Sequence, residues 1–234
     1  MYHDSFSNRG FEVGIHDLHH DGKLYRSQQS FRRAAVRINH YLHEWNATGF
    51  RSGFMHHNLQ WLHHLDIGYD MSTFDTDPFE PQPDGVHTIF PFWVQKPFDE
   101  KFRQDTSPSR TFSGYSELPY TLPQDSTLFL LLEHTSPHVW KTKLDWIAKH
   151  GGMALLNVHP DYLSFSGAGE LGEYPAKMYS EFLEYVLTNY RNQFWFALPS
   201  EVAAYAREVV GLGTNFVSRS GDPREIRGKV PLVV

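Results

Sequence analysis

Histidine is the residue type in this sequence that most directly suggests chemistry. The chain of 234 residues has 15 histidines, almost as many as its 17 glycines. Imidazole binds metal ions and changes charge near neutral pH, so this excess favours metal binding or proton transfer. His16 and His20 are four residues apart, and two imidazoles with this spacing can reach one Zn²⁺ from a helix or from a loop. The alternative is a solvated turn whose histidines are incidental.

Other reactive side chains stand where apolar segments end. His159 follows the apolar run ALLNV, and Arg51 ends a strand-like segment. Asp75 and Asp77 follow a third such segment. Each of these residues has a purely structural explanation: a histidine bonded to nearby backbone, a buried arginine paired with a carboxylate, and an Asp-Pro turn in which aspartate is the local cap.

The composition excludes several classes of protein. Cysteine is absent, which rules out disulfides, a thiol nucleophile and thiolate metal sites, so a zinc ion would need His, Asp or Glu ligands. The 21 Lys and Arg residues against 27 Asp and Glu give a net charge of -6, which argues against nucleic acid as a partner. The longest aliphatic run, at 128–132, is too short to span a bilayer. We therefore expect a soluble chain, cytoplasmic by default because its first residues carry no secretion signal.

Strand-like and helical patterns alternate along the chain. An apolar strand is expected at 11–16, and apolar residues recur every three to four positions through 28–45, as on the buried face of a helix. A strand at 47–51, a short helix near 59–65 and a strand-like segment at 67–74 repeat this order.

The second half of the chain shows the same alternation after an irregular region. Regular periodicity is lost over 78–124, apart from a strand expected at 87–94. The later expected elements are a strand at 127–133, a helix begun by Ser136 and Pro137 and ended by Gly151, a strand at 152–159, a helix through 178–186, a strand at 192–198 and a helix from Ser200.

This alternation predicts a single α/β domain built on a largely parallel sheet. Four of the expected strands lead to a reactive side chain: His16, Arg51, Asp75 and His159. In a (β/α) barrel the carboxyl ends of the strands meet at one mouth, where catalytic groups gather. We therefore expect these side chains to lie at one end of the sheet.

Four segments, taken in order, resemble the polysaccharide deacetylase family of carbohydrate esterases. They read HDLHH at 16–20, GFRSGF at 49–54, YDMSTFDTDPFEPQP at 69–83 and LLNVHPDY at 155–162. The block FDTDPFEPQP is the most specific of them, and the resemblance covers about residues 11–197. It implies a distorted (β/α) barrel and hydrolysis of acetyl groups on an N-acetylated glycan.

The resemblance also implies a role for each reactive residue. His16 and His20 would be the histidine ligands of a divalent metal, most often Zn²⁺. His159 would be the general acid that protonates the departing amine, and Asp75 or Asp77 would orient its ring.

The third motif would contribute two further parts. Arg51 would hold the carboxylate that acts as the base, and the backbone N–H near Gly53 or Phe54 would face the oxyanion.

The sequence departs from the family pattern in three places. The family usually has an Arg-x-Pro-Tyr third motif, whereas this chain reads Arg-Ser-Gly-Phe at 51–54. Asp17 replaces a usual Ser or Thr of the histidine motif, and Asp21 replaces its usual Pro. The family's first motif, which supplies the base and the third metal ligand, normally precedes the histidine motif by several tens of residues, whereas 15 residues precede His16 here. The chain is then either a truncation or a relative that has lost its base. The barrel would be incomplete on its amino-terminal side, and a partner, a second copy or the missing segment would cover the exposed face.

The leading hypothesis is therefore a metal-dependent deacetylase of an N-acetylated glycan. The alternative is a catalytically inactive relative that binds glycans, in which Trp93 and neighbouring aromatic residues stack on sugar rings. A third hypothesis is an unrelated metal-dependent amidohydrolase that uses the same barrel mouth.

Overall fold

The computed structural model describes residues 9–97, 113–166, 171–209 and 230–233. Its main element is a five-stranded sheet with the order β1-β2-β3-β5-β4. The first four strands in this order are parallel, and β4 joins the edge antiparallel to β5. The strands are β1 (Ile15–His16), β2 (Gly49–Arg51), β3 (Tyr69–Asp70), β5 (Gly114–Glu117) and β4 (Phe92–Gln95).

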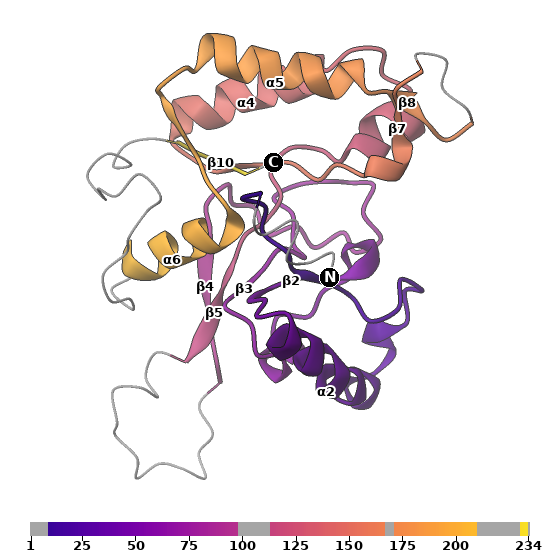
Figure 1. Ribbon diagram of the computed structural model, residues 1–234, viewed down its shortest axis with the longest axis vertical. Coiled ribbons are helices and arrows are strands. Elements are labelled where there is room, and N and C mark those ends of the chain that lie inside the picture. Colours follow the sequence, from indigo (N-terminus) through magenta and orange to yellow (C-terminus); the bar gives the residue numbers. More distant parts are fainter. Residues whose placement is uncertain (1–8, 98–112, 167–170, 210–229, 234) are drawn as a thin grey trace.

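Helix α2 (Gln28–Glu44) covers one face of this sheet (Figure 1). The side chain of Ser27 accepts a hydrogen bond from the N–H of Ser30 and so caps the helix. Four residues of α2 are buried in a cluster that also includes Ile15 of β1 and Phe50 of β2. These four are Phe31, Ala35, Ile38 and Leu42. Two short 3-10 helices, η1 (Leu24–Arg26) and η3 (Trp61–His64), contact α2.

A second, three-stranded sheet has the order β6-β10-β9 and is parallel throughout. Its strands are β6 (Ala154–Leu155), β10 (Val230–Val233) and β9 (Phe194–Phe196). Helices α4 (His138–His150) and α5 (Lys177–Asn189) lie side by side next to it, and α6 (Pro199–Val209) contacts the main sheet at β3, β4 and β5 (Figure 1). The other short elements are η2 (Gly53–Met55), a π-helix η5 (Ser126–Leu131), η6 (Pro160–Tyr162), β7 (Leu163–Ser164) and β8 (Tyr174–Pro175).

The α/β class and the largely parallel sheet are confirmed, because the described strands alternate with helices and pair mostly in parallel. The described strands form three sheets, of five, three and two strands, and close no barrel. The helix predicted at 28–45 is present, and Gly151 ends α4 with φ at 72°, a left-handed value that glycine adopts without strain. No helix in the described part of the chain is long and apolar enough to cross a membrane.

Two predicted elements are wrong. The run TLFLLLE at 127–133 was predicted as a strand, but most of it lies in the π-helix Ser126–Leu131. A short continuous apolar run has no period that separates a buried strand from a buried helix. The stretch 95–124 was predicted as an irregular loop, but it contains β5, which lies between β3 and β4 in the main sheet. Residues 98–112 of that stretch lie outside the described range.

Close packing of β2 against β3 depends on a glycine. A Cβ atom at Gly49 would lie 2.0 Å from the hydroxyl oxygen of Tyr69, its register partner. The Tyr69 hydroxyl donates to Glu12 Oε1 at 2.7 Å, and Glu12 Oε2 accepts from the N–H of Ser200 at 3.0 Å. The absence of a side chain at Gly49 therefore allows Glu12 to join the sheet to the first turn of α6.

Two carboxyl groups are buried next to each other in the main sheet. Asp70 of β3 and Glu117 of β5 are register partners, and both side chains are 0 % exposed. Thr73 donates to Glu117 Oε1 from its N–H and its hydroxyl, and Ser72 does the same for Asp70. Burial raises the pKa of Asp70, and it raises the pKa of Glu117 further together with the negative charge of Asp70.

This pair predicts a loss of stability at alkaline pH. Because both pKa values are raised by folding, the folded state holds these protons more tightly than the unfolded chain, so stability falls as pH rises above the ordinary carboxyl range. Glu117→Gln removes one charge and keeps an acceptor for Thr73. We expect it to raise the free energy of unfolding at pH 8 by about 1–3 kcal/mol and to flatten its dependence on pH. Urea unfolding at pH 5 and pH 8 measures both, with the exposed Glu184→Gln as control; an equal effect of the two substitutions would contradict the assignment.

Candidate functional site

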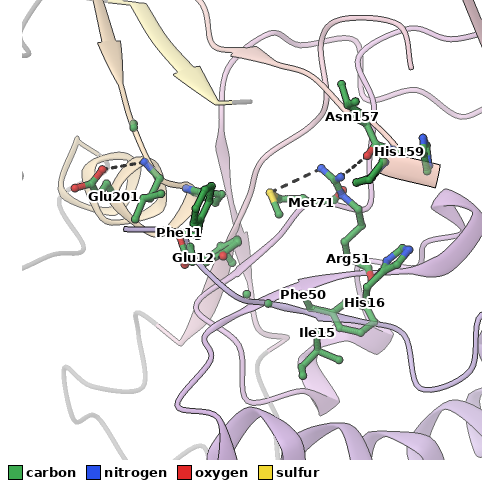
Figure 2. Close-up of a pocket in the computed structure, with 18 of the residues that line it drawn as sticks. Phe11, Glu12, Ile15, His16, Phe50, Arg51, Met71, Asn157, His159 and Glu201 are labelled. Carbon is green, nitrogen blue, oxygen red and sulfur yellow. Dashed lines mark hydrogen bonds between the residues drawn. The ribbon is translucent and has the colours of Figure 1, made fainter. Parts of the chain in front are cut away.

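A cavity of about 910 Å³ lies between the end of the main sheet and the segment that follows β6. His16, Arg51 and His159 line it together with His20 and Asn157. Figure 2 shows the side chains of His16, Arg51, Asn157 and His159 gathered on one side of this cavity, with Phe11, Glu12 and Glu201 on the other. The structure therefore brings together three of the four strand-end residues that the sequence singled out.

His16 and His20 form the histidine pair of the cavity. Their ring centroids are 5.1 Å apart, and His16 Nδ1 is 3.0 Å from the backbone oxygen of Arg51. This oxygen can only accept, so Nδ1 carries the proton and Nε2 keeps a free lone pair. Partial burial lowers the pKa of His16, and the nearby Arg51 charge lowers it further, which favours the neutral form that binds metals.

The loop after β2 packs directly against His20. The ring of Phe54 has its centroid 4.5 Å from that of His20, and a Cβ atom at Gly53 would lie 3.2 Å from the His20 ring. Phe54 and Met55 both have positive φ values, 57° and 52°. Two consecutive non-glycine residues in this region store backbone strain, which is typical of functional loops. Gly53 and Phe54 thus lie beside the histidine pair.

His159 is held by a carboxylate that the sequence analysis missed. Asp125 Oδ1 is 2.6 Å from His159 Nδ1, and Asp125 Oδ2 accepts from the His159 backbone N–H at 2.7 Å. Asp125 also accepts from the Tyr174 hydroxyl at 3.0 Å and from the N–H of Ser126 at 2.8 Å. The Asp125 side chain is 0 % exposed, whereas the His159 side chain is 35 % exposed. His159 Nε2 is therefore the ring nitrogen left for chemistry.

The structure corrects the expected partner of His159. Asp75 forms an ion pair with Lys143 of α4 at 2.7 Å, and Asp77 accepts a hydrogen bond from the Tyr120 hydroxyl at 2.9 Å. Neither residue lines the cavity. Burial raises the pKa of Asp75, and Lys143 opposes that shift. The two aspartates fix the loop after β3 instead, because the chain runs five residues beyond β3 before Asp75 and leaves the sheet end.

The side chain of Arg51 forms part of the cavity wall. Its Nη1 donates to Asn157 Oδ1 at 2.6 Å and its Nε donates to the Met71 backbone oxygen at 3.2 Å (Figure 2). Burial lowers the pKa of Arg51, but the ordinary value is so high that the group stays protonated. In the described part of the chain no carboxylate lies within ion-pair distance of Arg51, so the carboxylate partner expected for this residue is not among those residues.

Trp93, predicted to bind sugar, lies elsewhere. It belongs to β4, at the opposite edge of the main sheet from β1. Its indole N–H donates to Gln95 Oε1 at 3.2 Å, and the Arg207 guanidinium lies over its ring at 5.6 Å. The aromatic residues that line the cavity are different ones: Phe11, Phe50, Tyr69, Tyr162 and Phe196.

The donor atoms of His16 and His20 decide whether a metal ion fits this cavity. Two imidazoles whose ring centroids are 5.1 Å apart suit two positions of one tetrahedral site. Among the described residues no group of three or more His, Cys, Asp or Glu side chains is placed to hold a metal. His16 and His20 therefore fit as two ligands of one ion.

Asp125, Tyr174 and Asn157 carry weak sequence signals. Asp125 stands just before a helix, as a capping residue would, and nothing in its neighbourhood suggests contact with a residue 34 positions away. Asn157 lies two residues before His159, so strand alternation places both side chains on one side. Tyr174 is an isolated tyrosine after a polar segment.

Comparison with known proteins shows which fold the chain has. No family model and no curated protein sequence matches the chain. Among solved structures, the chain is similar to a "putative polysaccharide deacetylase" from Mycobacterium smegmatis, with a TM-score of 0.59 and 18% sequence identity. The similarity covers 93% of this chain and 70% of that protein. The chain therefore has the mixed α/β fold of that protein, with its parallel-rich sheet.

Proposed function

We propose that this protein is a metal-dependent hydrolase that removes acetyl groups from an N-acetylated glycan. One observation carries the proposal: a single cavity collects the histidine pair, Arg51 and a histidine held by a buried carboxylate. The four residues are His16, His20, Arg51 and His159. They come from the end of β1 and the loop after it, the end of β2 and the segment after β6, in the order that the deacetylase resemblance implies. The shared fold with the Mycobacterium smegmatis protein supports the same reaction class.

The chain's own residues would divide the work as follows. His16 and His20 would hold the metal, most often Zn²⁺ in the resembled family. When bound, such an ion polarises the acetyl carbonyl and lowers the pKa of a bound water. His159 Nε2 would give its proton to the departing amine, and Asp125 would keep the ring oriented. The strained Gly53–Phe54 turn would present its backbone N–H groups beside the histidine pair.

Three carboxylates line the cavity, and two of them have other contacts. Glu12 is bonded to Tyr69 and Ser200, and Glu201 accepts from the N–H of Leu198 at 2.8 Å. Asp161 is exposed at the cavity edge, next to His159. We assign the general base to none of them; in the resembled family this group comes from a motif upstream of the histidines. The reaction is therefore best assayed on the full product of the gene.

The test is acetate release from a panel of acetylated carbohydrates with zinc present. We expect acetate from N-acetylglucosamine oligomers, with one free amine formed for each acetate, and much less from O-acetylated xylan. Chitosan oligomers without acetyl groups are the blank. Release of no acetate from any acetylated sugar, while zinc is bound, would refute the proposal.

A glycan-binding protein without turnover is the second candidate. It is favoured by two exposed aromatic rings that line the cavity, Phe11 at 60% and Phe196 at 71% exposure. Exposed aromatic faces stack on sugar rings. Glycan affinity that survives removal of zinc, with no acetate formed, would select this candidate.

A further inference from the structure

A chain of hydrogen bonds leads from the cavity into the protein. Arg51 Nη1 donates to Asn157 Oδ1 at 2.6 Å, and Asn157 Nδ2 donates to Gln124 Oε1 at 2.6 Å. Gln124 Nε2 then donates to Glu80 Oε1. The four residues come from four separate parts of the sequence, and Figure 2 shows the first link at the cavity wall. We call this series of side chains the amide relay.

The direction of the relay is fixed by its two ends. A guanidinium can only donate hydrogen bonds, so Asn157 must present its oxygen to Arg51 and its NH₂ to Gln124. Gln124 must in turn present its own NH₂ to Glu80, whose carboxylate can only accept. Flipping either amide would place two donors or two acceptors against each other. The relay therefore links a cation at the cavity to a carboxylate at the other end through two aligned amides.

The Glu80 end is itself held in place. The Tyr120 hydroxyl lies 2.5 Å from Glu80 Oε1 and 2.9 Å from Asp77 Oδ2. Tyr120 is 1% exposed, and Asp77 Oδ1 accepts from the N–H of Phe79 at 3.0 Å. Burial raises the pKa of Glu80. This end belongs to the FDTDPFEPQP segment, none of whose residues lines the cavity.

We propose that Glu80 and Gln124 are positioning residues that set the orientation of the Arg51 guanidinium at the cavity wall. The inference rests on the proposed function and adds to it, since it explains how the most specific sequence motif serves a cavity that it does not line. Asn157 is 7% exposed, so water competes little with the central link. Loss of the Gln124 or Glu80 link would leave the Asn157 amide without the contact that fixes its direction, and Arg51 would then be held firmly only at Met71, through the backbone oxygen at 3.2 Å and the sulfur at 3.9 Å.

The first test is a double-mutant cycle between Arg51 and Gln124, which contacts Asn157 and Glu80. Gln124→Leu should lower kcat/KM by about 10-fold, in line with the cost of a small misplacement of a substrate-facing group. In an Arg51→Lys background the same substitution should change kcat/KM by less than about 2-fold, because the planar group that the relay orients is gone. The exposed Gln193→Leu, whose NH₂ contacts Asn189, is the matched control and should change nothing. Independent, multiplying effects of Gln124→Leu and Arg51→Lys would overturn the proposal.

The second test does not depend on activity. The Arg51 Nε–H signal can be followed by ¹⁵N NMR in the full chain, assigned by its loss in Arg51→Lys. We expect the signal to move and its hydrogen exchange to accelerate by at least about 10-fold in Gln124→Leu and in Glu80→Gln. An unchanged signal in both folded variants would overturn the relay even if the protein is a deacetylase. A shifted signal in a protein that releases no acetate would keep the relay and reject the enzyme.

Discussion

Replacement of Asp125 by asparagine is expected to lower the rate of acetate release by about 10²–10⁴-fold, the range for loss of general acid-base catalysis. The carboxylate accepts hydrogen bonds from His159 Nδ1, the His159 and Ser126 N–H groups and the Tyr174 hydroxyl, and it is fully buried. Asparagine has one acceptor oxygen and an NH₂ group, so it cannot satisfy these donors together. The His159 ring then loses the contact that orients Nε2 toward the departing amine.

The matched control for this substitution is Asp145→Asn. Asp145 lies on α4, is exposed, and accepts hydrogen bonds from two tyrosines, Tyr185 and Tyr190. The Asp145→Asn variant should keep full activity. Initial rates of acetate release, measured from pH 5 to 9 for both variants and the wild type, test this expectation. A rate within 3-fold of the wild type at all these pH values would show that His159 does not depend on Asp125.

Loss of either cavity histidine is expected to have the second large effect. His16→Ala and His20→Ala should each weaken zinc binding by at least about 100-fold, since loss of outer-shell partners alone costs 10–100-fold. The rings are neighbours at 5.1 Å, and His16 is oriented by the Arg51 carbonyl oxygen. Isothermal titration of metal-free protein with zinc measures the affinity.

His19→Ala is the control for both substitutions. His19 is in the same loop but does not line the cavity. Its replacement should leave zinc affinity unchanged. If all three variants bind zinc as the wild type does, the HDLHHDG loop is the solvated turn that the sequence also allowed.

Local patterns in the sequence were enough to predict much of the fold. The three-to-four spacing of Phe31, Ala35, Ile38 and Leu42 defines a helix because only a helix places them on one face, and these side chains are buried together. His16 and Arg51 were placed at strand ends because the apolar runs stop there, and they are the last residues of β1 and β2. Periodicity is informative where one face of an element is buried.

Contacts between distant segments could not be predicted in the same way. The partner of His159 was expected in the aspartate-rich segment, whereas Asp125 holds it across 34 positions. Asp125 precedes an apolar run that was read as a strand and forms a π-helix. The π-helix and the end of β6 together place Asp125 beside His159. The spacing of residues within one segment cannot predict how these two segments meet.

The most direct test of the proposed enzyme is a zinc titration of the metal-free full gene product during turnover of an N-acetylglucosamine oligomer. The account predicts that acetate and free amine appear in equal amounts, that the rate saturates at about one zinc per chain, and that His159→Gln binds zinc but releases acetate at least about 100 times more slowly. Bound zinc without acetate release, or release that is unaffected by His159→Gln, would contradict it.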